Sequence, residues 1–150
     1  MSVWSRVMRR LIEVSCDLNA RLRRVPQIDV AAARRRGADD RSTIWIDVRT
    51  AAERQVSTLE GAIAWDHPDL TTALPTKSQV ITFCTAGFRS GSFAATLRRQ
   101  GIDAVNLRGG LFAWCDSHLE LVDPDGQPTQ RVHIYGRSWK FIPDDYEAVW

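Results

Sequence analysis

Hydrophobic side chains in the first 25 residues recur at steps of three and four, as they do on one face of an amphipathic helix. This apolar face consists of Val3, Val7, Leu11, Val14, Leu18, Leu22 and Val25. The opposite side is polar and carries Arg9, Arg10, Glu13, Asp17 and Arg24. We expect this helix to pack on its own domain, on a second copy of the chain or on a protein partner. Glu13 and Asp17 dilute its positive charge, which argues against contact with a membrane surface.

A second pattern, in which strands and helices alternate, runs from residue 26 to residue 118. Short apolar, often β-branched runs predict strands at 44–48, 62–65, 80–84 and 104–107. Helices are expected within 26–37, after the capping box of Thr50 and Glu53, over about 90–100, and after Gly109-Gly110. Gly37 should end the first of them. Such alternation predicts an α/β fold with a parallel sheet covered by helices on both faces.

The last segment, 119–150, departs from this alternation. Residues 119–122 and 130–135 predict a β-hairpin around the turn at 123–126. We expect the aromatic residues that follow to cover the sheet domain or a partner; they are Trp139, Phe141, Tyr146 and Trp150. The chain therefore divides into an N-terminal amphipathic helix (1–25), a central domain (26–118) and a C-terminal hairpin with an aromatic extension (119–150).

The composition fits a folded domain and argues against a general polyanion binder. Hydrophobic residues make up 44% of the chain and charged residues 25%, so a buried core can form. The formal net charge is only +2, and residues 1–41 hold ten Arg against five Asp and Glu. The rest of the chain is mildly acidic, so we expect no nucleic-acid partner.

The three cysteines, Cys16, Cys84 and Cys115, do not form a disulfide framework or a zinc site, because their number is odd and no pair has C-x-x-C spacing. This usage fits a reducing compartment, and no apolar run has the length of a membrane span, so we expect a soluble cytoplasmic protein. Cys115 shares a helical face with Leu111 and Trp114 and is expected to be buried. Cys16 lies on the polar side of the first helix, where we expect no role for it.

Cys84 is the strongest candidate for a reactive side chain, because it ends the most apolar of the predicted strands. Sites in parallel sheets lie at the carboxyl ends of strands. The loop that leads from Cys84 into the next helix consists of Thr85, Ala86, Gly87, Phe88 and Arg89. Its small residues let successive N–H groups converge, while the helix N-terminus and Arg89 add positive charge. We therefore expect a sulfur anion that is stabilised by the loop and open to water.

Four separated segments resemble the motifs of rhodanese-like domains and occur in the same order; they are 44–49, 61–63, 84–90 and 106–114. The resemblance covers about residues 26–118. It implies a five-stranded parallel sheet flanked by helices on both faces, with its first strand near Ile28 and the reactive Cys84 after its fourth strand. It also implies that residues 85–89 bind an anion and that no metal or organic cofactor is needed.

Three residues beside the loop are assigned supporting roles. Asp47 and Arg49 lie at the end of the strand 44–48. One interpretation makes Asp47 a general acid and Arg49 a phosphate-binding residue. A buried charged network that braces the loop, with Arg49 paired to Glu53 or Asp47, is the favoured interpretation. Ser90 stands where related phosphatases carry Arg, because only four residues separate Cys84 from Arg89. The narrower loop suits a sulfur atom attached to Cys84 rather than a phosphate.

The resemblance implies a sulfurtransferase that works in two half-reactions. Cys84 would take a sulfane sulfur from a small anionic donor such as thiosulfate, and the resulting persulfide would pass it to cyanide, a thiol or a protein cysteine. The alternative is a regulatory or sulfur-carrier module that acts mainly by binding a protein partner. Residues 3–25 or the C-terminal tail would then provide the surface for the partner or for self-association.

Overall fold

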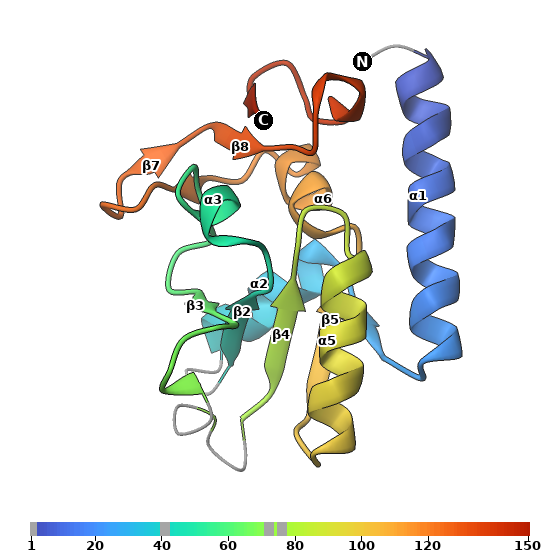
Figure 1. Cartoon of the computed structure of the whole chain (residues 1–150), viewed down its shortest axis with the longest axis vertical. Coiled ribbons are helices and arrows are strands. Elements are labelled where there is room, and N and C mark those ends of the chain that lie inside the picture. The colour runs from blue at the N-terminus through green and yellow to red at the C-terminus, as the bar shows by residue number, and fades with distance from the viewer. Residues whose placement is uncertain (1–2, 40–42, 71–73, 75–77) are drawn as a thin grey trace.

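A five-stranded parallel sheet forms the centre of the computed structural model, which describes residues 3–39, 43–70, 74 and 78–150. The strand order is β1-β5-β4-β2-β3 (Figure 1). The strands are β1 (Gln27–Ile28), β2 (Ile44–Asp47), β3 (Ile63–Ala64), β4 (Val80–Phe83) and β5 (Ala104–Leu107). Both the predicted α/β class and the predicted strand positions are therefore confirmed, and Cys84 directly follows the fourth strand.

Helices cover both faces of the sheet, as predicted. They are α1 (Val3–Leu22), α2 (Val30–Asp39), α3 (Ala51–Arg54), α5 (Phe88–Arg99) and α6 (Gly110–Asp116). Because successive strand residues point to opposite faces, Ile81 and Phe83 join one core with α2 and α6, while Val80 and Cys84 join another with α5 and α1. Two predicted boundaries are wrong: α5 begins at Phe88 rather than near Ser90, and α2 continues through Gly37 to Asp39.

The N-terminal helix α1 stands beside α5 (Figure 1) with a different face toward the domain than its periodicity suggested. Its buried residues are Arg9, Cys16 and Ala20. The apolar face from Val3 to Leu22 is exposed, and only Val25, beyond the helix, is buried. The helix packs on the domain, as one of the alternatives expected, but through the side that carries Cys16 and Ala20, so its apolar face is left uncovered. Small residues explain why this side of α1 faces the domain. The two helices approach closely at Gly91 of α5, where an added Cβ would lie 3.6 Å from Asn19 of α1.

Buried Arg9 connects α1 to the end of α6 and to the C-terminal segment. Its guanidinium donates to Asp116 Oδ1 at 2.8 Å, at the end of α6, and to the carbonyl of Phe141 at 2.7 Å. The two acidic residues of α1 also have partners, since Glu13 pairs with Arg9 and Asp17 pairs with Arg108 at 2.6 Å. Within the described residues, no helix is both long and apolar enough to cross a bilayer.

The C-terminal segment forms two small sheets rather than the single hairpin that was predicted. Strand β6 (Leu121–Val122) pairs with β7 (Pro128–Thr129), so the hairpin closes two residues before the expected start of its second strand. Strand β8 (Arg131–His133) instead runs parallel to β9 (Glu147–Val149). A short 3-10 helix, η1 (Arg137–Trp139), lies between β8 and β9.

The aromatic tail covers the sheet domain in part. Phe141 and Tyr146 are buried in the same core as β4 and α6, and Trp139 packs against its edge. Trp150 is exposed and does not cover the sheet domain. The tail reaches the mouth of the reactive loop because β8 continues into Tyr135, whose ring lies 5.2 Å from the guanidinium of Arg89.

Replacing Arg9 with Met should weaken the attachment of α1, because Asp116 and the buried Phe141 carbonyl would lose their donor. We expect a loss of about 2 kcal/mol in the free energy of unfolding. Arg10→Met is the matched control, since Arg10 is exposed, and should change stability by less than about 0.5 kcal/mol. Urea denaturation of both variants measures the difference, and equal stabilities would contradict this role for Arg9.

Candidate active site at the Cys84 loop

The loop between β4 and α5 turns sharply at Gly87. This residue has φ 97°, in the left-handed region that glycine adopts without a steric penalty. The turn directs the Gly87 N–H to Cys84 Sγ at 3.1 Å. The sulfur therefore faces the N-terminal end of α5, whose unpaired amides favour a negative charge.

The start of α6 holds the other side of this loop. The N–H of Leu111 donates to the Cys84 carbonyl at 2.9 Å, and the N–H of Phe112 donates to the Thr85 carbonyl at 3.0 Å. A side chain cannot fit between the two segments, because a Cβ at Gly110 would lie 2.1 Å from the Cys84 carbonyl oxygen. The reactive loop and the turn after β5 thus lie in direct backbone contact.

The Cys84 side chain is 0% exposed, so the expectation that its sulfur lies open to water is wrong. The side chain points into the layer between β4 and α5, where Sγ lies 3.4 Å from the Ser90 hydroxyl. Ala86, on the outer side of the loop, is itself covered by α1, since Cys16 Sγ donates to the Ala86 carbonyl at 3.3 Å. A reagent therefore reaches Cys84 only when the rim of the loop moves.

Ser90 is held by a residue that the sequence analysis did not single out. Its hydroxyl donates to Asn106 Oδ1 at 2.6 Å, and Asn106 Nδ2 donates to the Gly87 carbonyl at 2.9 Å. Ser90 has one hydroxyl hydrogen, so it can donate at one time either to Asn106 Oδ1 or to Cys84 Sγ. The sequence could have indicated this role, because Asn106 is a polar residue in the buried strand β5 and buried amides need hydrogen-bond partners.

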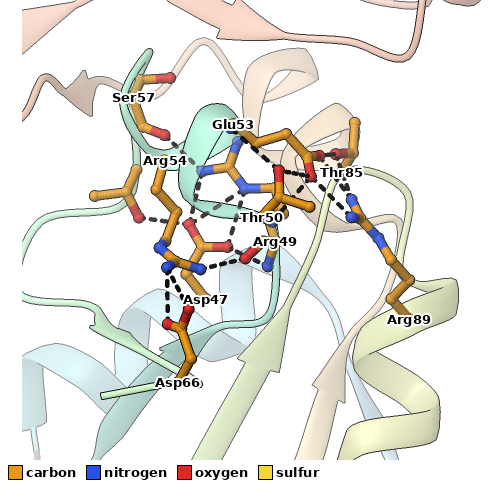
Figure 2. Close-up of polar contacts among 10 residues, drawn as sticks. Asp47, Arg49, Thr50, Glu53, Arg54, Ser57, Asp66, Thr85 and Arg89 are labelled. Carbon is orange, nitrogen blue, oxygen red and sulfur yellow. Dashed lines mark hydrogen bonds and ion pairs between the residues drawn. The ribbon is translucent and has the colours of Figure 1, made fainter. Parts of the chain in front are cut away.

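Arg89 does not stand free beside the loop but pairs with Glu53 (Figure 2). Two parallel bonds of 2.8 and 2.7 Å join the guanidinium to the carboxylate, which also accepts from Thr85 Oγ1 at 3.0 Å. Burial alone would raise the pKa of Glu53, but the bonds to Arg89 and Thr50 outweigh it and lower the pKa to about 2. The carboxylate neutralises the cation that was expected to bind an anionic substrate.

Glu53 also closes the predicted capping box with Thr50, which the structure confirms. The sequence analysis assigned it only this local role and an alternative pairing with Arg49. The strand order could have indicated that Glu53 lies near the Cys84 loop. Helix α3 follows β2, the Cys84 loop follows the neighbouring strand β4, and the carboxyl ends of parallel strands meet at one edge of a sheet.

Asp47 and Arg49 form the buried ion pair that the sequence favoured, with Asp47 rather than Glu53 as the partner. Arg49 Nη2 lies 2.7 Å from Asp47 Oδ2 and donates to the Ser57 carbonyl at 2.5 Å (Figure 2). Thr58 donates to the same carboxylate at 2.7 Å. This network fixes the backbone between β2 and α3, from which Glu53 reaches the Cys84 loop.

The other cysteines lie in different surroundings. Cys115 is buried in the core under α6, as predicted, and burial raises its pKa to about 12. Cys16, for which we expected no role, is also buried and donates to the carbonyl of Ala86 in the Cys84 loop. No three His, Cys, Asp or Glu side chains gather into a metal-binding group anywhere in the described ranges.

Comparison with known proteins agrees with the fold and with the placement of the loop. A sequence model of the rhodanese-like domain matches residues 29–117. The chain belongs to the rhodanese-like domain family. It is 33% identical over 106 residues to a sulfurtransferase of Allochromatium vinosum, a match that covers 68% of this chain and 99% of the relative.

Two further matches cover only part of longer proteins. The chain is 34% identical over 107 residues to a tRNA uridine(34) hydroxylase of Bordetella pertussis, covering 61% of this chain and 43% of the hydroxylase. The fold of a thiosulfate sulfurtransferase from Pseudomonas aeruginosa matches with a TM-score of 0.64 and 21% identity, covering 77% of this chain and 23% of that one. The proteins that this chain resembles are thus named for different activities.

Gly110→Ala should disrupt the site, because the new methyl group would collide with the Cys84 carbonyl. We expect a destabilisation of at least about 3 kcal/mol. Gly126→Ala is a matched control: φ is positive at both glycines, but nothing lies within 4 Å of the position of a Cβ at Gly126. This control should lose only about 1 kcal/mol. Urea denaturation compares the variants, and equal losses would contradict the close backbone contact.

Glu53→Gln should destabilise the protein in a pH-dependent way. The lowered pKa means that ionised Glu53 stabilises the fold above its ordinary value of 4.5, and this contribution is lost as the pH falls toward 2. We expect a deficit of about 2–3 kcal/mol at pH 7 that shrinks toward pH 2. Denaturation curves across this range measure it, with exposed Glu60→Gln as the control. A deficit that does not change with pH would contradict the ion pair with Arg89.

Proposed function

We propose that this chain is a sulfurtransferase that carries a sulfane sulfur on Cys84 from a donor such as thiosulfate to a thiophilic acceptor. The observation that supports this most directly is the position of Cys84 Sγ, at 3.1 Å from the Gly87 N–H and facing the first turn of α5. Such a position stabilises a sulfur anion electrostatically without a metal or an organic group.

In the first half-reaction, the rim of the loop moves aside, Cys84 loses its proton to solvent, and its thiolate attacks the outer sulfur of thiosulfate. A sulfur–sulfur bond forms as the bond to the sulfonate breaks, and sulfite leaves with the electron pair. The product is a Cys84 persulfide whose terminal sulfur carries the negative charge. In the second half-reaction cyanide or a thiolate attacks that sulfur, and Cys84 departs as a thiolate.

The buried sulfur and the neutralised Arg89 favour a second candidate function. A module that mainly carries sulfur to one protein partner needs a protected persulfide and little turnover with small anions. Complete burial of Cys84 and the ion pair of Arg89 with Glu53 fit these needs. The two functions differ in turnover, because a carrier forms the persulfide but transfers its outer sulfur only slowly to cyanide.

Intact-mass measurement after incubation with thiosulfate tests the proposal. The native chain should gain the mass of one sulfur atom, Cys84→Ala should gain none, and Cys115→Ala should behave like the native chain because Cys115 is buried away from the loop. Thiocyanate release in the presence of cyanide then separates an enzyme from a carrier. Equal labelling of the native chain and Cys84→Ala would contradict both.

A further inference from the structure

A hollow of about 540 Å³ opens beside the rim of the reactive loop. Three parts of the chain line it: α1, the start of α5 with its loop, and the segment after β8. The lining residues are Met8, Leu11, Ile12, Ser15 and Cys16, then Ala86, Phe88 and Arg89, and finally Tyr135 and Trp139.

The hollow lies against the loop that follows Cys84, although Cys84 itself is not among its lining residues. Cys16, one of its walls, donates to the Ala86 carbonyl at 3.3 Å. Burial and then the nearby Cys84 sulfur raise the pKa of Cys16 to about 12, and the same two causes raise the pKa of Tyr135. Ala86, Phe88 and Arg89 of the loop line the same hollow, so a molecule that rests against Cys16 and Tyr135 lies next to the loop.

The chemistry of the walls does not suit a small inorganic anion. Aliphatic and aromatic side chains form most of the surface, and the one cation, Arg89, is neutralised by Glu53. A hydrated dianion would lose water here without gaining a free positive charge. The volume also falls in the range of sites that enclose organic molecules, which is far more than thiosulfate or cyanide fills.

We propose that this hollow binds the apolar body of an organic thiol that accepts the sulfur from Cys84. The proposal rests on the sulfurtransferase function, for which it specifies the acceptor. The acceptor loses its proton to solvent, and its thiolate attacks the terminal sulfur of the Cys84 persulfide. The bond between Cys84 Sγ and the terminal sulfur breaks, so the acceptor becomes a persulfide and Cys84 leaves as a thiolate.

The walls of the hollow come mostly from outside the part of the chain that matches the family. The match covers residues 29–117, whereas α1 precedes it and both Tyr135 and Trp139 follow it. The shared domain therefore contributes the reactive loop, and the flanking segments of this chain determine which acceptor fits beside it.

Discharge of the persulfide by thiols of increasing length tests the proposal. The full chain is loaded with thiosulfate, and its reaction with ethanethiol, 1-butanethiol, 1-hexanethiol and cyanide is followed in single turnovers. Apolar burial should increase the second-order rate constant about threefold per added methylene group until the hollow is filled. Rate constants that do not rise with chain length would overturn it.

Leu11 and Leu18 provide a matched pair of variants. Both lie on α1 and both are 56% exposed, but only Leu11 lines the hollow. Leu11→Ser should lower the ratio of the 1-hexanethiol rate constant to the cyanide rate constant by about threefold to tenfold, while Leu18→Ser should keep the native ratio. Equal ratios in the two variants would place the apolar contact elsewhere and overturn the proposal.

A binding measurement separates failure of the acceptor site from failure of the chemistry. Addition of 1-hexanol, which has the same chain but no thiol, should shift the NMR signal of the Trp139 indole in the native chain and less in Leu11→Ser. If thiosulfate forms no persulfide, the sulfurtransferase function fails while this shift still supports the hollow as a binding site. Absence of the shift refutes the hollow even where the persulfide forms.

Discussion

Two turns of backbone in direct contact determine where the Cys84 sulfur lies. The Cys84 loop follows β4, the Gly109-Gly110 turn follows the neighbouring strand β5, and the carbonyls of Cys84 and Thr85 accept bonds from the first amides of α6. Since a side chain at Gly110 would collide with the loop, the distance between these turns depends on the sheet rather than on side-chain packing. The position of Sγ thus depends on the backbone contact between the two turns that follow β4 and β5.

The charges around the loop are matched in pairs. Arg49 pairs with Asp47, and Arg89 pairs with Glu53, so neither guanidinium offers an unneutralised charge to a ligand. Stabilisation of a sulfur anion therefore relies on the Gly87 amide and the N-terminal end of α5. Because backbone amides rather than free side-chain cations would stabilise the sulfur anion, the loop can lie next to a hollow with mainly apolar walls.

The sequence was sufficient to predict features that depend on neighbouring residues. The run from Val80 to Phe83 specifies a buried strand, and Thr50 with Glu53 specifies a capped helix, because both patterns act within a few residues. The ion pair of Glu53 with Arg89 joins residues that are 36 positions apart, and no periodicity encodes it. The burial of Cys84 escaped prediction for the same reason, since it depends on packing against Ser90 and on α1 over Ala86.

The orientation of α1 shows a second limit. Periodicity identifies the apolar face of a helix but not the direction in which that face points. Here the small side chains of Cys16 and Ala20 and the absence of one at Gly91 decide which side meets α5. The hairpin after β6 was misplaced similarly, because residues 131–133 pair with β9, which lies 16 positions further along.

The hydrogen bonds of Arg9 affect how the segments that flank such a domain can vary. One guanidinium binds both Asp116 at the end of α6 and the carbonyl of Phe141, so the segments on either side of the sheet domain are tied together over its surface. Substitutions in these segments can reshape the surroundings of the sulfur while the sheet and the loop remain untouched. Because α1 also covers Ala86, such substitutions would change the access to Cys84 together with the walls of the hollow.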